Sequence, residues 1–379
     1  MKKAFKIVSI LLILALAAAL TACQPTATVG GAQPPAASAA PASASVQAAA
    51  ASQTAANGDL PTLKVAWFAA TIKQALTTTA YALGYFEEEG VHVENVSLQT
   101  AGDAITALTL GKVDVVPVGI TQQLQFISQG QDLVIFGGSA MEGGAIIVKP
   151  GSEEKYKNWA NWKGVNWGTG RSYTGDFVVR DQLRKNGIVP GEDITVTDLE
   201  NDNGIIQAVA KGSVDVGYIT ADGVAIARQL GLSVITKVGE LSPNYTCCRQ
   251  TTTSKVIADK SDQLVAYERA LIRAYKVIQS DHQKAIDIMI KQTGQSQAYV
   301  ESGLYGEYAS KYNPDPSKKA VEQFNKFLIQ EGVVTNTSVS LDDHISTDIY
   351  RQALSEILQK YPDDKEYQDL KTYSDSIDQ

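Results

Sequence analysis

One ten-residue segment occurs twice in this chain, about 100 residues apart, and it constrains the fold more than any other feature. The two copies span residues 107–116 and 208–217. Each reads as the end of a helix, a glycine that stops the helix, and a short apolar strand. A repeat at this spacing has the size of half a domain and not of a solenoid unit. The sequence therefore predicts two similar α/β units side by side.

Each copy of the repeat carries an aspartate inside its predicted strand, at Asp114 and at Asp215. A plain buried strand would avoid a charge at such a position. As a catalytic pair, the two carboxylates would have to converge on one substrate. The repeat instead places them at equivalent positions of two separate units. We therefore expect each one to have a structural role, as an acceptor for backbone N–H groups.

Length and charge narrow the class of protein. A chain of 379 residues is long enough for two domains with substantial cores. Its net charge is −8, and without residues 1–22 it has 30 basic and 41 acidic residues, a net charge of −11. Binding to phosphate backbones needs a basic surface. We therefore expect no nucleic acid among the partners.

The N-terminus has the pattern of an export signal. Lys2, Lys3 and Lys6 precede an apolar run at residues 7–20, which is too short for a bilayer that takes about 20 residues to cross. The run ends in Leu-Thr-Ala-Cys, which resembles the lipobox of bacterial lipoproteins. We expect residues 1–22 to be removed and Cys23 to be lipidated. An ordinary signal peptide with an incidental cysteine is the alternative.

Residues 23–59 consist almost entirely of Ala, Ser, Pro, Gln, Thr and Gly. Such a segment has too few large apolar groups to offset the entropy of ordering, so we predict a disordered tether. Two or more acyl chains on Cys23 would anchor the chain stably. The predicted location is the extracytoplasmic face of the cell membrane, with a lipid anchor.

From residue 60 onward, strand patterns alternate with helix patterns, which predicts a mostly parallel sheet with helices on both faces. Strands are expected at residues 63–68, 91–98, 113–118, 133–136, 144–148, 194–199, 214–219 and 233–238. From residue 259 the pattern becomes helical. The segment beyond residue 362 is polar and charged, so we expect this tail to fray.

Four motifs carry a resemblance to a known family: ALGYFEEEGVHV at 82–93, LGKVDV at 110–115, NWKG at 161–164 and GTGRS at 168–172. With the lipobox and the helical C-terminus, they resemble the substrate-binding lipoproteins of ABC importers. The closest group is the nitrate/sulfonate/taurine family, which includes thiamine-pyrimidine binders. The resemblance covers about residues 60–331. It implies an α/β, two-lobed periplasmic-binding-protein fold (type II), with mixed sheets, flanking helices and a helical C-terminal region.

Mapped onto this chain, the resemblance implies two lobes with the ligand in a cleft between them. The expected divisions are a signal peptide at 1–22, a tether at 23–59, lobe 1 at 60–148, lobe 2 at 149–239, a second crossover with C-terminal helices packing on lobe 1 at 240–361, and a polar tail at 362–379.

In open α/β sheets, ligands bind beyond the carboxyl ends of the strands. One loop that this rule selects is residues 168–174, in which glycines let the backbone approach a ligand and hydroxyl groups precede a helix. Exposed N–H groups at a helix N-terminus suit an anion. The resemblance places ligand contacts at Thr169, Gly170, Ser172 and Tyr173, and we add Thr174. A simple helix cap is the alternative.

The remaining candidates lie in loops at the ends of other strands, and they are Trp67, Phe68, Thr121, Arg171, Asn201, Tyr218 and Asp222. The two aromatics after the first strand could stack on a planar ligand or belong to the core. Arg171 could pair with an anion or be solvated. Asp222, with the acidic loop at 200–203, favours an amine or a hydroxyl donor, unless it only caps its helix. A zwitterion or an aminopyrimidine would reconcile both kinds of group.

Cys247 and Cys248 are adjacent, so they cannot join distant segments. A vicinal disulfide and a pair of free thiols are both compatible with the sequence. If the mapping holds, Cys247 lies near the cleft. Pyrimidine-synthesising relatives carry a Cys-rich motif in a comparable region, but this chain has only the pair. A zinc site needs four ligands at suitable spacing, so we predict no metal and no cofactor.

The sequence therefore predicts a monomeric receptor that captures a small-molecule solute and delivers it to an ABC permease and its ATPase. An enzyme of the same fold, such as a pyrimidine-precursor synthase, is one alternative. Against it stand the export signal and the lack of a catalytic triad or a nucleotide fingerprint in the sequence. A lipoprotein that senses a ligand for a membrane receptor is another.

Overall fold

The computed structural model describes residues 60–68, 71–170 and 172–377. The predicted signal peptide, lipidation site Cys23 and tether lie outside the described residues, as does Arg171. Within the described ranges, the fold is α/β with mixed sheets, as predicted. No helix in these ranges has the length and apolar character needed to cross a membrane.

What we call the first sheet consists of a two-stranded part, β2-β1, and a three-stranded part, β3-β11-β4, which one isolated bridge joins. Their bounds are β1 Thr62–Trp67, β2 His92–Ser97, β3 Val116–Gly119, β4 Val134–Gly138 and β11 Cys248–Thr252. β1 is parallel to β2, and a parallel bridge between Val65 and Val115 connects β1 to the segment that enters β3. β11 is antiparallel to both β3 and β4. A strand from late in the chain is therefore inserted in the middle of this sheet.

The second sheet has the order β10-β6-β9-β7-β8. Its strands are β6 Ala145–Val148, β7 Asn166–Gly170, β8 Thr195–Leu199, β9 Val216–Ile219 and β10 Ser233–Lys237. β6 is antiparallel to both of its neighbours, β9 and β10. It therefore has the same place in this sheet that β11 has in the first. We expected residues 144–148 to belong to lobe 1, but the backbone of residues 145–148 pairs with β9 and β10 in the second sheet.

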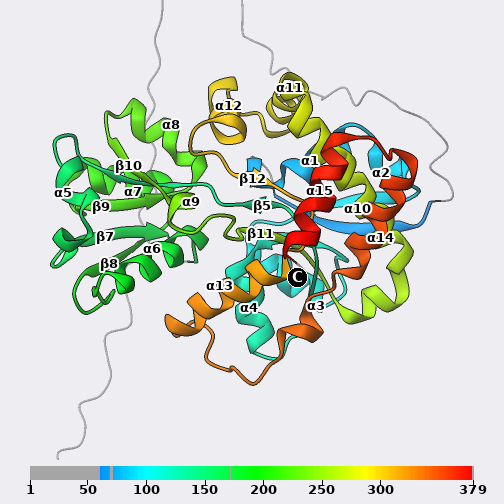
Figure 1. Ribbon diagram of the computed structural model, residues 1–379, viewed down its shortest axis with the longest axis horizontal. Coiled ribbons are helices and arrows are strands. Elements are labelled where there is room, and N and C mark those ends of the chain that lie inside the picture. Colours follow the sequence, from blue (N-terminus) through cyan, green and yellow to red (C-terminus); the bar gives the residue numbers. More distant parts are fainter. Residues whose placement is uncertain (1–59, 69–70, 171, 378–379) are drawn as a thin grey trace, which may run out of the picture. The chain divides into compact units, whose positions relative to one another are not determined.

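Helices cover both faces of the second sheet (Figure 1). α6 (Thr174–Lys185) packs on one face with Ile146 and Val148, while α7 (Asp202–Lys211) and α8 (Ala221–Gln229) pack on the other with Ala145 and Ile147. Successive side chains of a strand point to opposite faces, so the apolar run of β6 supplies both cores.

The first sheet is also covered on both faces. α1 (Ala75–Ala82), α10 (Ser254–Ser280) and α14 (Asp348–Lys360) share one apolar core with Val65 and Phe136. α3 (Ala101–Thr109), α4 (Ile120–Ser128) and α13 (Lys318–Gln330) contribute to another. This second core also includes Trp167 and Phe177 of the second sheet and its α6, so the two sheets are joined by apolar packing.

The other elements are short connections and C-terminal helices. They are η1 Ile72–Gln74, α2 Tyr85–Glu88, β5 Ala140–Met141, α5 Glu153–Lys157, η2 Trp159–Trp162, α9 Val238–Leu241, α11 His282–Thr293, α12 Gln297–Tyr305, β12 Lys311–Tyr312, η3 Leu341–His344 and α15 Lys365–Ile377.

The repeated segment forms the same structure in both units. α3 and α7 each end before a glycine with positive φ, +66° at Gly111 and +81° at Gly212, and the chain then enters β3 or β9. Asp114 Oδ2 accepts the backbone N–H of Lys64 at 2.8 Å, and Asp215 Oδ2 accepts that of Asn166 at 2.8 Å. The structural role predicted for the two aspartates is confirmed.

The prediction that the C-terminal tail frays is wrong for most of its length. Residues 365–377 form α15, in which Tyr367, Leu370 and Ser374 are buried. These three positions recur at helical spacing and lie on one face. The polar composition of the segment hid this narrow buried stripe, of which Tyr367 and Leu370 pack in the core of the first sheet.

Candidate functional site

Two adjoining cavities lie where loops of the first and second sheets meet, and we call them together the cleft. The inner cavity has a volume of about 190 Å³, and the outer one about 370 Å³. Lys73, Tyr173 and Thr220 line both of them. Seven of the predicted ligand-binding residues line one or both cavities: Ser172, Tyr173, Thr174, Asn201, Tyr218, Asp222 and Cys247.

The glycine-rich loop after β7 directs an aromatic ring into the cleft. Ser172 has φ +68°, in the left-handed region, and the chain turns there so that Tyr173 N donates to Gly170 O at 3.1 Å. A Cβ atom on Gly170 would lie 2.6 Å from the ring of Tyr173, so only glycine leaves room for this turn. The main role of the loop is therefore to position Tyr173. It does not cap the helix through a side chain, since Tyr173 makes no side-chain cap hydrogen bond.

A second aromatic ring stands against the first. The rings of Tyr173 and Tyr218 are 6.0 Å apart between centroids, with an interplanar angle of 79°. The Tyr218 hydroxyl donates to Gly143 O at 3.3 Å, and the Tyr245 hydroxyl donates to the same oxygen at 2.7 Å. Burial raises the pKa of Tyr218 and of Tyr245 well above the ordinary value, so both stay neutral. The edge-to-face pair forms a rigid aromatic wall.

Lys73 is the cationic group of the cleft, and it is not among the residues predicted from the sequence. It lies in η1, directly after β1, and its Nζ is 5.8 Å from the centroid of the Tyr173 ring. Burial alone would lower the pKa of Lys73, but Asp222, Cys247, Cys248 and Asp202 raise it well above its ordinary value. In the part of the chain that the structure describes, its ammonium group forms no hydrogen bond and no ion pair. A half-buried cation without a partner has lost part of its hydration, and no hydrogen bond or ion pair offsets that loss.

Two carboxylates face the same space. Asp202 accepts hydrogen bonds from Thr220 N at 3.1 Å and from its hydroxyl at 2.6 Å. Burial raises the pKa of Asp202, against the opposing effect of Lys73. Asp222 Oδ2 accepts from the Tyr299 hydroxyl at 3.0 Å, while its buried Oδ1 has no partner among the described residues. Asp222 therefore bonds across to α12 rather than capping its own helix.

The structure does not bring the other predicted residues into contact with the cleft. Trp67 packs on Tyr81 with 5.4 Å between ring centroids, and Phe68 packs against the core. Thr121 and Thr169 are buried and line neither cavity, and Gly170 only makes room for its neighbour. Asn201, by contrast, lines the outer cavity, and its side chain accepts from Gly204 N at 3.1 Å and so caps α7.

Cys247 and Cys248 line the inner cavity as free thiols, with 3.4 Å between their sulfur atoms. The hydrogen bond from Cys248 lowers the pKa of Cys247 to about 6, and Lys73 and Thr174 contribute in the same direction against the effect of burial. The same hydrogen bond raises the pKa of Cys248 well above its ordinary value. Among the described residues, no group of three or more His, Cys, Asp and Glu side chains could hold a metal ion.

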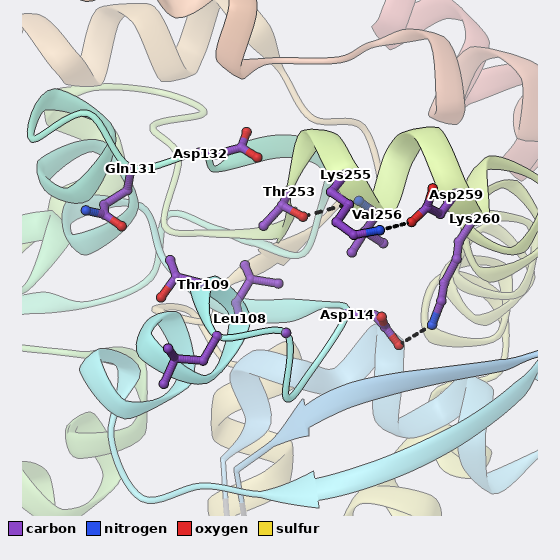
Figure 2. Close-up of a pocket in the computed structure, with 12 residues that line it drawn as sticks. Leu108, Thr109, Asp114, Gln131, Asp132, Thr253, Lys255, Val256, Asp259 and Lys260 are labelled. Atoms are coloured by element: carbon purple, nitrogen blue, oxygen red, sulfur yellow. Dashed lines mark hydrogen bonds and ion pairs between the residues drawn. The ribbon is translucent and has the colours of Figure 1, made fainter.

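A larger cavity, of about 540 Å³, lies between the end of α3 and the start of α10. Figure 2 shows two ion pairs in its wall, with Lys260 Nζ 2.9 Å from Asp114 Oδ2 and Lys255 paired with Asp259, while Asp132 accepts from Ser254. Such paired charges are already satisfied and do not call for a ligand. The cleft, with its unpaired cation and carboxylate oxygen, is the better candidate site despite its smaller inner volume.

Comparison with known proteins identifies the family and the fold. The family described as NMT1/THI5 like matches residues 73–285. No curated protein sequence matches the chain. The periplasmic aliphatic sulphonate binding protein SsuA of Escherichia coli shares 17% identity over 76% of this chain and 93% of its own, with a TM-score of 0.65.

Two further solved structures are similar. The nitrate-binding protein NrtA of Synechocystis PCC 6803 has 13% identity over 79% of this chain and 89% of its own, with a TM-score of 0.64. A ligand-binding component of an ABC-type import system from Staphylococcus aureus, with zinc bound, has 17% identity over 77% and 99%, with a TM-score of 0.64. All three are binding proteins. The chain belongs to the NMT1/THI5-like family and has the fold of the periplasmic binding proteins.

Proposed function

We propose that the protein is an extracytoplasmic solute-binding lipoprotein that captures a small polar organic solute in the cleft and delivers it to an ABC importer. The observation that carries the proposal is the ammonium group of Lys73, which is half-buried beside an aromatic wall and has no partner in the described ranges. A negatively charged group of a solute would complete this interaction. The export signal and the similar binding proteins support the same conclusion.

The two sheets would be the cores of two lobes, with crossings just before β6 and between β10 and β11. The cleft receives groups from both sides, since Lys73 follows β1, whereas Tyr173 precedes α6 and Tyr218 lies in β9 of the second sheet. A solute that contacts both lobes binds the closed state more tightly than the open state. The difference between the two binding free energies is the amount by which the solute stabilises the closed state. A permease and its ATPase are the partners that would receive the closed, monomeric receptor.

The charges of the cleft favour a solute that carries both an acidic and a basic or donor group. Lys73 suits a sulfonate or a carboxylate, while the unpartnered Oδ1 of Asp222 suits an ammonium group or an amino group on a ring. A simple anion such as nitrate would leave the Asp222 oxygen without a partner, at a free-energy cost. We therefore favour an aminosulfonate-like zwitterion or an aminopyrimidine.

A thermal-shift screen of the full chain tests this assignment. Taurine, ethanesulfonate, nitrate and a 4-aminopyrimidine serve as probes, and stabilisation of about 2.7 kcal/mol is expected at 100 times the Kd of a true solute. Tyr173→Ala should abolish the stabilisation because it removes one ring of the aromatic wall. Tyr361→Ala, which removes an exposed tyrosine outside both cavities, is the matched control. Full stabilisation of the Tyr173→Ala protein by the same solute would refute the assignment of the cleft.

The lipid anchor is tested by replacing Cys23, which lies outside the described residues. We expect Cys23→Ser to move the protein from the membrane fraction to the soluble extracytoplasmic fraction, because no acyl chain can then be attached. Fractionation of cells and immunodetection measure the change, with Cys247→Ser as the control for loss of a cysteine. Continued membrane retention of the Cys23→Ser protein would contradict the lipoprotein assignment.

A further inference from the structure

We propose that Cys247 and Cys248 form a thiol–disulfide exchange site in the cleft, at which Cys247 attacks a small-molecule disulfide and Cys248 resolves the mixed disulfide. This activity goes beyond solute binding and does not depend on it. It rests on three features of the described structure: the separation of the two sulfur atoms, their place in the wall of a cavity, and the groups that surround Cys247.

The two sulfur atoms are 3.4 Å apart, which is hydrogen-bonding distance for thiols. Their backbone is held firmly, since Cys247 N donates to Ala140 O at 3.3 Å, Ile120 N donates to Cys247 O at 2.8 Å, and Cys248 pairs with Gly119 across β11 and β3. A resolving thiol must reach the sulfur that carries the adduct. Here Cys248 is already in contact with that sulfur.

The inner cavity gives a disulfide access to the pair, but only a small one. Both cysteines line this cavity, although the exposed fractions of Cys247 and Cys248 are only 8% and 7%. The cavity volume of about 190 Å³ is too small for a peptide chain and large enough for a short organic group. The site would therefore select small, unbranched disulfides over protein disulfides.

The surroundings assign the two roles. The thiolate is the nucleophile in such an exchange, and an attacking thiol is most effective when its pKa lies near the ambient pH. The hydrogen bond from Cys248, aided by Lys73 and Thr174, lowers the pKa of Cys247 to about 6, whereas that of Cys248 is raised. The charged and titratable groups that face the pair from neighbouring elements are Lys73, Glu142, Tyr218, Tyr245, Arg249 and Tyr312. The carboxylate of Glu142 is paired with Lys311, whose Nζ is 2.7 Å away.

These neighbours favour a negative charge at Cys247. Lys73 and Arg249 are the cations among them, and both attract the thiolate. Burial raises the pKa of each of the three tyrosines, so they remain neutral around neutral pH and add no competing charge. Cys247 is therefore the attacking thiol and Cys248 the resolving one.

Each step is balanced. The Cys247 thiolate attacks one sulfur of a disulfide R–S–S–R, so that a Cys247–S–S–R bond forms and R–S⁻ leaves. Cys248 then loses its proton to solvent and attacks the Cys247 sulfur, which forms a Cys247–Cys248 disulfide and releases the second R–S⁻. The two cysteines lose two electrons, and the small disulfide that gains them becomes two thiols. Excess thiol reverses both steps.

The vicinal disulfide formed in this way would be readily reduced. Adjacent Cα atoms are 3.8 Å apart across a trans peptide, which is about 0.6 Å less than the shortest separation usual for disulfides. Closing the bond therefore strains the peptide between the two cysteines, which the hydrogen bonds around β11 hold in place. Strained disulfides of this kind are the labile ones, so the site would act reversibly.

The test uses the full chain in a Cys23→Ser background, bis(2-hydroxyethyl) disulfide as the probe, and intact-mass spectrometry. The protein with both Cys247 and Cys248 should lose the mass of two hydrogen atoms and carry no stable adduct. Cys248→Ser should trap one hydroxyethylthio group on Cys247, located by peptide mapping. Cys247→Ser should react at least ten times more slowly at pH 7, because burial still raises the pKa of the remaining thiol, Cys248.

Two further measurements complete the test: the pH dependence of the reaction rate, and the reactivity of the variants unfolded in urea. The rate of adduct formation on Cys248→Ser should rise mainly below pH 7 and then level off, because the pKa of Cys247 is lowered, while in urea both single-cysteine variants should react alike. Circular dichroism verifies that the variants are folded. Equal rates for the two folded variants, or no reaction of the protein that retains both cysteines, would overturn the proposal. Neither result would bear on solute binding, which the thermal-shift screen measures separately.

Discussion

Replacing Lys73 with methionine is expected to weaken the binding of an anionic solute by roughly 10- to 100-fold, since a hydrogen bond to a charged group contributes about 1.5–3 kcal/mol. Methionine retains most of the length of the side chain and removes the charge. The ammonium group is available for a solute because no described residue pairs with it. Isothermal titration calorimetry with the best sulfonate or carboxylate from the thermal-shift screen measures the change in Kd.

Two further substitutions, one of a matched lysine and one of an acidic residue, test whether the loss of affinity is specific to Lys73. Lys64→Met removes a half-exposed lysine of β1 whose partner, Glu94, is 3.9 Å away at the surface, and it should leave Kd unchanged. Asp222→Asn should weaken an aminosulfonate while leaving a simple sulfonate nearly unaffected. If Lys73→Met bound all anionic probes as tightly as the unmodified protein, the cleft would not be an anion site.

Much of the fold follows from local sequence pattern. The repeated segment predicted two similar units, and the structure shows the same helix, glycine and strand in each, with Asp114 and Asp215 bound to equivalent backbone N–H groups. These features depend on residues within one α/β unit, so a sequence window contains the whole signal. The turn at Ser172 and the aromatic position of Tyr173 were also predictable, because glycines mark the loop.

Features that depend on distant segments were not predictable in the same way. Residues 145–148 are apolar at every position, which predicts a strand buried on both faces but does not say which sheet contains it. Lys73 follows the first strand in a short 3-10 turn, and nothing in its neighbourhood distinguishes it from a solvated lysine. Its role arises because Tyr173, Asp222 and the cysteines approach from other parts of the chain.

Glu268→Gln is expected to change how stability depends on pH more than any other substitution considered. Glu268 lies on α10 and is fully buried, and neither of its carboxyl oxygens has a partner among the described residues. The carboxyl group lies against β4, where a Cβ atom on Gly137 would be 1.8 Å from Oε1. Burial, with a smaller contribution from Asp315, raises the pKa of Glu268 well above its ordinary value. The folded protein therefore keeps this carboxyl group protonated up to a higher pH than the unfolded chain does.

A raised pKa makes the folded state bind a proton that the unfolded state has already released. Between the unfolded pKa of about 4.3 and the folded pKa, the free energy of unfolding should fall by up to about 1.4 kcal/mol for each unit of rising pH. Glutamine has no proton to lose, so the Glu268→Gln protein should lack this component. Its stability relative to the unmodified protein should therefore rise with pH over this window.

Urea unfolding at several pH values between 5 and 8 measures the difference between the two proteins, in which contributions from other groups cancel. Placing an amide in the same space can lower the free energy of unfolding by an amount that does not depend on pH. Such a loss shifts the difference between the two proteins by a constant and leaves its slope against pH unchanged. Glu192→Gln, at an exposed position, is the control and should give a difference that does not vary with pH. A flat difference for Glu268→Gln as well would mean that the carboxyl group is ionised and hydrated in the folded protein. The buried acid would then not be the source of pH sensitivity that its position beside Gly137 implies.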